Sequence, residues 1–241
     1  MKPTLSIVMI AYNEATNLER CLKAANFADE IIVVDQGSSD DTVKIAKGLG
    51  ATVVHQEWLG FGRQKNVAIA HATSDWVLSL DADELVTPAG RTEIERTLAD
   101  AKANGYYFPR LAFVGKRAVH HSGWYPDYQL RLVRRNQAKF EEKEVHERMI
   151  EPATTAHLRE PLLHYTYASV SQWLGKINRY TDEEVAEKPF SLARLLFKPP
   201  LAFLRCYFLW SGWRDGVIGL AVATSNFTTQ FWLELKRWEK C

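Results

Sequence analysis

The sequence predicts an α/β protein built on a mostly parallel sheet with helices on both faces. Two observations carry this prediction. Short apolar runs rich in β-branched residues alternate four times with segments of helical periodicity, at the spacing of βαβ units. Acidic residues follow three of these runs at their carboxyl ends, which is where open α/β sheets bind their ligands.

The first half of the chain supplies the repeated pattern. Its first helix starts at Asn13-Glu14-Ala15-Thr16 and repeats apolar residues at the spacing of a helix packed on a sheet. Pro88 favours the start of the last helix of this half, because its fixed backbone angle suits a first turn. The predicted strands are Ser6–Ile10, Glu30–Asp35, Ala51–His55 and Trp76–Leu80, and the later helices cover about 42–49, 63–72 and 89–104.

After Asn104 the alternation gives way to aromatic strands and a charged segment. We predict strands over 106–114, 128–134 and 162–167, with dense charge over 139–151. An amphipathic helix is predicted over 169–187. The expected domains are therefore residues 1–168, which hold the sheet, and residues 169–241, which hold a helical region.

Composition limits the class of protein. The net charge of +1 gives no case for nucleic-acid binding. The three cysteines are scattered, so they suggest neither a disulfide framework nor a zinc site and fit a reducing compartment. The N-terminus runs into the first strand without the long apolar segment of a secretory signal, so a cytoplasmic location is expected.

The stretch from Lys188 to the end is basic and aromatic. It holds eight Lys or Arg against three acids, with four of the eight Trp and six of the eleven Phe. Interruption by Lys198-Pro199-Pro200 argues against a membrane-spanning helix. Aromatic and basic residues together predict helices lying on the cytoplasmic face of a membrane, and a helical lid packed on the sheet is the alternative.

Asp81 and Asp83 directly follow the fourth predicted strand. Two carboxylates one residue apart suit Mg²⁺ or Mn²⁺, which prefers oxygen ligands and bridges to substrate phosphates. An isolated Asp-x-Asp is more simply interpreted as a solvated turn. Because Glu14 and Asp35 also follow strands of the same sheet, a functional site at this edge is favoured.

Four motifs, in this order and spacing, resemble the inverting family-2 glycosyltransferases of the GT-A fold. They are Ile7–Glu14, Val33–Thr42, Lys65-Asn66 and Asp81–Asp83. The resemblance implies a Rossmann-like GT-A domain with a mixed, mostly parallel sheet, here followed by a C-terminal helical, membrane-associating appendage. The Gln-x-x-Arg-Trp signature of processive members is absent, which implies that a single sugar is added.

Three later patches resemble one branch of this family, the bacterial lipopolysaccharide-core β-1,4-glucosyltransferases. They are Trp124–Leu132, Val145–Glu147 and Gly212–Gly216. The branch implies transfer of glucose from UDP-glucose to an inner-core heptose of a lipid-linked oligosaccharide at the inner face of the cytoplasmic membrane. Transfer to a polyprenyl-phosphate carrier and a non-catalytic nucleotide-sugar-binding protein are the alternatives.

The resemblance also assigns roles at the nucleotide-sugar site. Tyr12 would contact the uracil and Glu14 the nucleoside, although this segment is also a plain helix start. Asp35 would accept a hydrogen bond from uracil N3–H. Lys65 and Asn66 would contact the uracil or the diphosphate, with Arg63 as the nearby alternative.

Metal and base roles follow in the same way. Asp83 would bind the metal directly, and Asp81 would contact the ribose or a metal-bound water. His146 would be either a third metal ligand or a structural residue. Inversion requires a base to deprotonate the acceptor hydroxyl, and two carboxylates compete for this role: Asp127, which we prefer, and Glu147.

Overall fold

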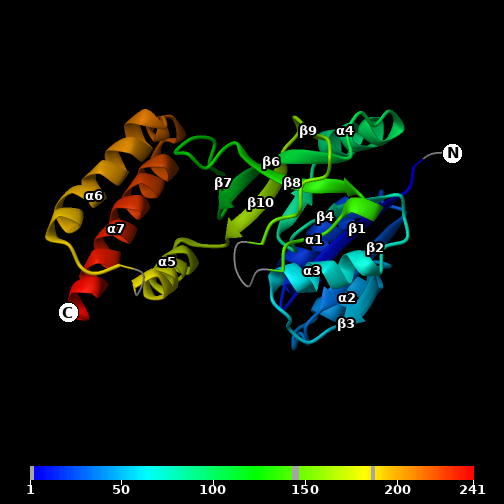
Figure 1. Cartoon of the computed structure of the whole chain (residues 1–241), viewed down its shortest axis with the longest axis horizontal. Coiled ribbons are helices and arrows are strands. Elements are labelled where there is room, and N and C mark those ends of the chain that lie inside the picture. Colours follow the sequence, from blue (N-terminus) through cyan, green and yellow to red (C-terminus); the bar gives the residue numbers. More distant parts are fainter. Residues whose placement is uncertain (1–2, 143–146, 186–187) are drawn as a thin grey trace. The chain divides into compact units, whose positions relative to one another are not determined.

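The computed structural model describes residues 3–142, 147–185 and 188–241. The chain forms two compact units, each treated by itself below (Figure 1). Unit 1 consists of Met1–Arg110 and Asp127–His164, and unit 2 of Leu111–Pro126 and Tyr165–Cys241. Strands β6 and β10 each pass from one unit into the other.

Unit 1 is organised around a mixed sheet with the strand order β3-β2-β1-β4-β8-β6-β10-β5, with β9 paired to β6. Neighbours among the first four strands of the chain are parallel, whereas β8 is antiparallel to both β4 and β6, and β5 is antiparallel to β10. A parallel sheet is therefore found in the first half of the fold, and the second half adds antiparallel pairs. The strands are β1 Leu5–Ala11, β2 Glu30–Asp35, β3 Thr52–His55, β4 Trp76–Ser79, β5 Glu84–Val86, β6 Gly105–Val114, β8 Asp127–Arg134, β9 Thr155–His157 and β10 Leu162–Tyr167.

Helices cover both faces of this sheet, as predicted. Successive side chains of a strand point to opposite faces, so Ile7 and Met9 of β1 join one core and Val8 joins the other. Helices α1 (Ala15–Ala25), α2 (Thr42–Gly48) and α4 (Pro88–Ala99) contribute to the first core, and α3 (Phe61–Ala70) contributes to the second. The buried face of α1 consists of the predicted residues Leu18, Cys21, Leu22 and Ala25.

Helix α4 is shorter than the pattern predicts. It ends at Ala99, and the Tyr106 hydroxyl accepts hydrogen bonds from the backbone N–H groups of Lys102 and Ala103 at 2.9 and 3.0 Å. The side chain thus satisfies two donors that a longer helix would have used internally. The short strands β5 and β9 were not predicted, because three residues carry too little periodicity.

Unit 2 is mainly helical and has its own core. Helices α6 and α7 lie side by side (Figure 1), and Trp173, Cys206 and Val222 are buried in the core that they share with α5. Helix α6 continues through Pro199 and Pro200 instead of breaking there. The elements are β7 Arg117–Ala118, α5 Val170–Glu184, α6 Leu192–Leu204, η3 Arg205–Leu209, η4 Gly212–Asp215 and α7 Val217–Glu239. Among the described residues, none of the helices combines the length and apolarity needed to cross a membrane.

Candidate active site

Asp81 lies directly beyond β4 and is held by two buried cations. Its Oδ1 is 2.9 Å from Lys65 Nζ, and its Oδ2 accepts a hydrogen bond of 2.6 Å from Arg131 Nη2. Burial opposes ionisation of this carboxyl, but the charges of Arg131 and Lys65 outweigh it and hold the pKa of Asp81 well below its usual value. Asp81 is therefore a fixed anion in this structure.

Glu84, which the sequence motifs do not include, organises the turn that carries both aspartates. Its carboxylate is fully buried and accepts a 2.6 Å hydrogen bond from Arg131 and a 3.1 Å bond from the backbone N–H of Asp81. Arg110 also lies within 3.5 Å of it. A carboxylate is buried in a stable fold only where such partners are present. The available signal for Glu84 in the sequence was an acid directly after Asp-x-Asp, on a short strand.

Asp127 opens β8 and is positioned by two neighbours. Its Oδ2 accepts hydrogen bonds from Arg110 Nε and Nη2 at 2.9 and 2.6 Å, and its Oδ1 accepts one from Gln129 Nε2 at 2.8 Å. Arg110 faces it because β6 and β8 pair in the register Arg110↔Asp127. The side chain keeps 39% of its surface exposed, so a ligand can reach it.

Glu147 joins the same set of ion pairs through Lys65, whose Nζ lies 2.9 Å from Glu147 Oε1. The two candidate bases are therefore the ends of one chain of alternating charges, here called the charge network. Its members are Glu147, Lys65, Asp81, Arg131, Glu84, Arg110 and Asp127.

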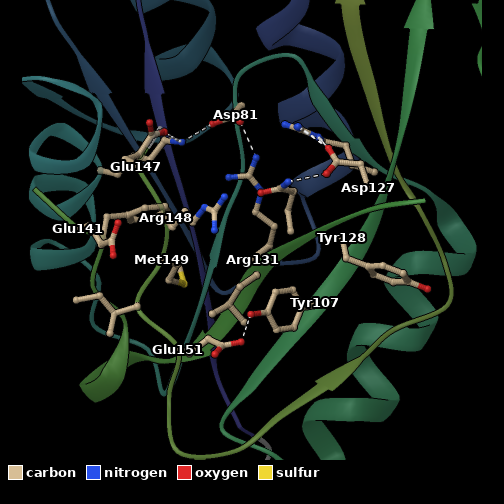
Figure 2. A pocket seen from close by; sticks show the side chains of 16 residues that line it. Asp81, Tyr107, Asp127, Tyr128, Arg131, Glu141, Glu147, Arg148, Met149 and Glu151 are labelled. Atoms are coloured by element: carbon tan, nitrogen blue, oxygen red, sulfur yellow. Dashed lines mark hydrogen bonds and ion pairs between the residues drawn. The ribbon is translucent and has the colours of Figure 1, made fainter. Parts of the chain in front are cut away.

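A cavity of about 750 Å³ opens beside the charge network. Figure 2 shows Glu147, Asp81 and Asp127 along one side of it and Tyr107 with Glu151 at the opposite side. Its size is within the range of small-molecule sites. The charged residues among its described lining are Asp81, Asp127, Glu141, Glu147, Glu151, Lys65, Arg110, Arg131 and Arg148.

Asp83 meets a partner that the sequence did not suggest, His164. The register of β10 on β5 places His164 opposite Glu84, and its Nε2 lies 3.2 Å from Asp83 Oδ2. A carboxylate oxygen and an imidazole nitrogen are suitable ligands for Mn²⁺, so this pair fits a divalent ion that takes its remaining ligands from a diphosphate and water. Among the described residues, no group of three or more His, Cys, Asp or Glu has metal-binding geometry.

The loops after β1 and β2 hold each other in place. Asp35 is buried and accepts hydrogen bonds from the backbone N–H groups of Gly37 and Ser38 at 2.8 and 2.9 Å. Asn13, at a φ of 53°, accepts a 2.9 Å bond from the N–H of Ser39. These contacts shape the edge where the nucleoside is expected.

The two other nucleoside candidates differ in exposure. Tyr12 is 51% exposed beside this edge. Glu14 is partly buried, and burial raises its pKa; a hydrogen bond from Asn17 lowers it, and the negative charge of Asp83 raises it further. Glu14 and Asp83 therefore lie within electrostatic reach of each other.

Two further predicted residues, Asn66 and His146, are not among the residues that define the charge network. The Asn66 amide donates to the carbonyl of Phe140 at 3.0 Å and accepts from its N–H at 2.8 Å, so both of its polar atoms bind backbone. His146 lies outside the described residues. The structure thus brings together Lys65, Asp81, Asp127 and Glu147, with Asp83 beside His164.

Comparison with known proteins finds similarity to glycosyltransferases. Residues 6–162 match the family described as glycosyl transferase family 2. A lipopolysaccharide core biosynthesis glycosyltransferase, LpsC, of Rhizobium meliloti is 27% identical over 99% of this chain and 93% of that protein. An uncharacterized glycosyltransferase of Rickettsia typhi is 30% identical over 85% of this chain and 76% of its own length.

Solved structures support the fold. The crystal structure of S. aureus TarS 1-349 superposes with a TM-score of 0.51 and 12% identity, covering 99% of this chain and 92% of that one. At this identity the likeness concerns the mixed α/β, GT-A-like architecture alone. The family match spans the sheet, the Asp81-Ala82-Asp83 turn and both candidate bases. The chain therefore belongs to glycosyl transferase family 2.

Proposed function

We propose that the protein transfers a single glucose from UDP-glucose, with inversion, onto a lipid-linked saccharide, the inner-core heptose of lipopolysaccharide. The observation that carries the proposal is the cavity lined by Asp81, Asp127 and Glu147, together with the pairing of Asp83, two residues after Asp81, with His164. The full-length similarity to a protein named for lipopolysaccharide core biosynthesis supports the acceptor class.

The donor is held by the edge of β1, β2 and β4. Tyr12 lies against the uracil, Asp35 accepts from its N3–H, and Glu14 contacts the nucleoside. Lys65 faces the negative charge that develops on the leaving diphosphate, where a fixed cation favours the transition state. Asn66 fixes the loop at Phe140 that borders this region.

Asp127 acts as the base. The acceptor hydroxyl attacks the anomeric carbon from the side opposite to UDP, its proton passes to an Asp127 carboxylate oxygen, and the bond to the diphosphate breaks. Arg110 and Gln129 orient the carboxylate for this transfer. Glu147 is the alternative base, but its side chain is 15% exposed against 39% for Asp127.

Asp83 and His164 would hold Mg²⁺ or Mn²⁺, with Asp81 beside them. When bound, the ion neutralises charge on the leaving diphosphate. Asp81 contributes as a fixed anion that keeps Lys65 and Arg131 in place.

Replacing His164 by Ala is expected to weaken Mn²⁺ binding at least about tenfold, because loss of a ligand costs at least as much as loss of an outer partner. Titration calorimetry with Mn²⁺ in the presence of UDP measures this, and Asp83→Asn should have a similar effect. His71→Ala is the matched control, since His71 is an exposed residue at the end of α3. Unchanged Mn²⁺ affinity in both site variants would show that neither His164 nor Asp83 binds the metal.

The anomeric configuration and the acceptor of the product test the proposed reaction. Transfer from UDP-glucose, whose anomeric carbon is α-configured, to deacylated lipopolysaccharide core should give a β-linked glucose, read from its anomeric proton coupling in NMR. An α-linked product would exclude inversion, and transfer only to a polyprenyl phosphate would exclude the proposed acceptor.

We also propose that unit 2 binds the inner face of the cytoplasmic membrane, where a lipid-linked acceptor lies. Along α6 and η3, four apolar side chains recur at intervals of four, three and four residues and are between 48% and 63% exposed; they are Phe197, Leu201, Leu204 and Phe208. Lys198 and Arg205 flank them, and no acid occurs from Leu192 to Leu209. Such a surface suits anionic lipid.

Changing Phe197, Leu201, Leu204 and Phe208 together to Ser should weaken binding to phosphatidylglycerol vesicles at least about 100-fold. This follows if each side chain contributes about 0.7 kcal/mol to the free energy of vesicle binding, which is half the smallest value for full burial of such a side chain. Vesicle co-sedimentation measures it, with Leu49→Ser plus Leu59→Ser in unit 1 as a control that removes other exposed leucines. Undiminished sedimentation of the fourfold variant would exclude this surface as the anchor.

A further inference from the structure

The far side of the cavity carries an aromatic cluster that the donor and base roles leave unused. Tyr107 stacks on His157 with ring centroids 5.0 Å apart and an interplanar angle of 15°. Tyr128 meets the same His157 edge to face at 4.7 Å and 89°. Tyr107 and Tyr128 line the cavity, whereas the donor candidates Tyr12 and Asp35 do not.

Tyr128 is exposed and yet fixed. Its side chain is 44% exposed, although it lies on β8 and packs against His157. Because the ring is already held in place, a ligand can bind against its flat apolar face with little further loss of side-chain entropy. The C–H groups on one face of a pyranose carry partial positive charge and pair with the negative face of an aromatic ring.

The polar groups around the cluster favour a neutral, hydroxyl-rich ligand. Glu151 accepts a hydrogen bond from the Tyr107 hydroxyl and lines the same space. Carboxylates are acceptors only, so they suit sugar hydroxyls and repel phosphate. Arg110, on the strand β6 that pairs with β8, is already paired with Asp127 and Glu84.

The aromatic cluster shares its cavity with the candidate base. Tyr128 is the residue after Asp127, both lie at the start of a strand, and both line one cavity. A saccharide bound against Tyr128 thus occupies the cavity that the candidate base also lines. We propose that Tyr128, supported by His157 and Tyr107, is a stacking platform for a neutral pyranose of the acceptor; the acceptor role rests on the proposed function.

Saturation-transfer NMR with methyl α-D-mannopyranoside tests the platform without requiring turnover. The wild type should saturate the ring C–H protons, Tyr128→Ala should reduce the signal at least about fivefold, and Tyr128→Phe should retain it. Mannose 6-phosphate, the charged match of the probe, should give a weaker signal. Trp58→Ala, which removes another exposed aromatic residue outside the described lining, should behave as wild type.

Three results would overturn the platform: no saccharide signal from the wild type, an unchanged signal in Tyr128→Ala, or an equal signal from the phosphorylated sugar. In turnover, Tyr128→Ala should raise the acceptor KM at least about tenfold and leave the KM for UDP-glucose unchanged. Absence of UDP release by the wild type would refute the proposed function, while the NMR titration would still decide whether Tyr128 binds a saccharide.

Discussion

Asp127→Asn is expected to lower kcat for sugar transfer by about 10²–10⁴-fold, the usual contribution of a general base. Asn keeps the size of the side chain and an oxygen that can accept from Arg110, so the loss reports proton transfer rather than packing. The KM for UDP-glucose should change little, because in the proposed reaction Asp127 contacts the acceptor hydroxyl and not the nucleotide. Steady-state kinetics with saturating acceptor measures both parameters.

Glu147→Gln is the matched comparison for this experiment. Lys65, the partner of Glu147, also binds Asp81, so Glu147→Gln is expected to lower kcat less than loss of the base does. If Asp127→Asn turned over near the wild-type rate while Glu147→Gln abolished transfer, the base would be Glu147. UDP binding measured on both variants would show that each retains its donor site.

Arg131→Met should lower the free energy of unfolding of unit 1 by about 3–5 kcal/mol, the cost of removing one partner from a buried ion pair. Arg131 is 5% exposed and donates to both Asp81 and Glu84, so its removal leaves two carboxylates without their main partner. The charges of these two acids also raise the pKa of Arg131 against the effect of its burial. Hydrogen exchange of β4 and β8 amides under native conditions measures the effect within unit 1.

Arg91→Met supplies the control for Arg131→Met. Arg91 pairs with Glu95 on the surface of α4, where the two side chains are 48% and 39% exposed. Exposed pairs of this kind contribute less than about 1 kcal/mol. A change below about 1 kcal/mol in Arg131→Met as well would show that the charge network does not hold unit 1 together.

The sheet and its first helices were predictable because their signals are local. Apolar runs such as Ile31–Val34 and the helical spacing of Leu18, Cys21 and Leu22 follow from burial against a sheet. The acids at strand ends were predictable for the same reason, since parallel strands bring their carboxyl ends to one edge.

The contacts that arrange the site were less accessible from sequence. His164 reaches Asp83 through the pairing of β10 with β5, a strand of three residues without a periodic signal. Asn13, a good helix cap by composition, instead takes a left-handed conformation and binds the next loop. Lys65 resembles a solvated helix residue, but its partners Asp81 and Glu147 are 16 and 82 residues away in the chain.

The proposed transferase activity is tested most directly by UDP release from UDP-glucose with purified deacylated lipopolysaccharide core, with Mn²⁺ or Mg²⁺ present and then removed by EDTA. We predict release that requires the acceptor, stops on chelation and resumes when the metal is restored. Binding of UDP-glucose without release of UDP, in the presence of both acceptor and metal, would contradict a transferase and indicate a nucleotide-sugar-binding protein.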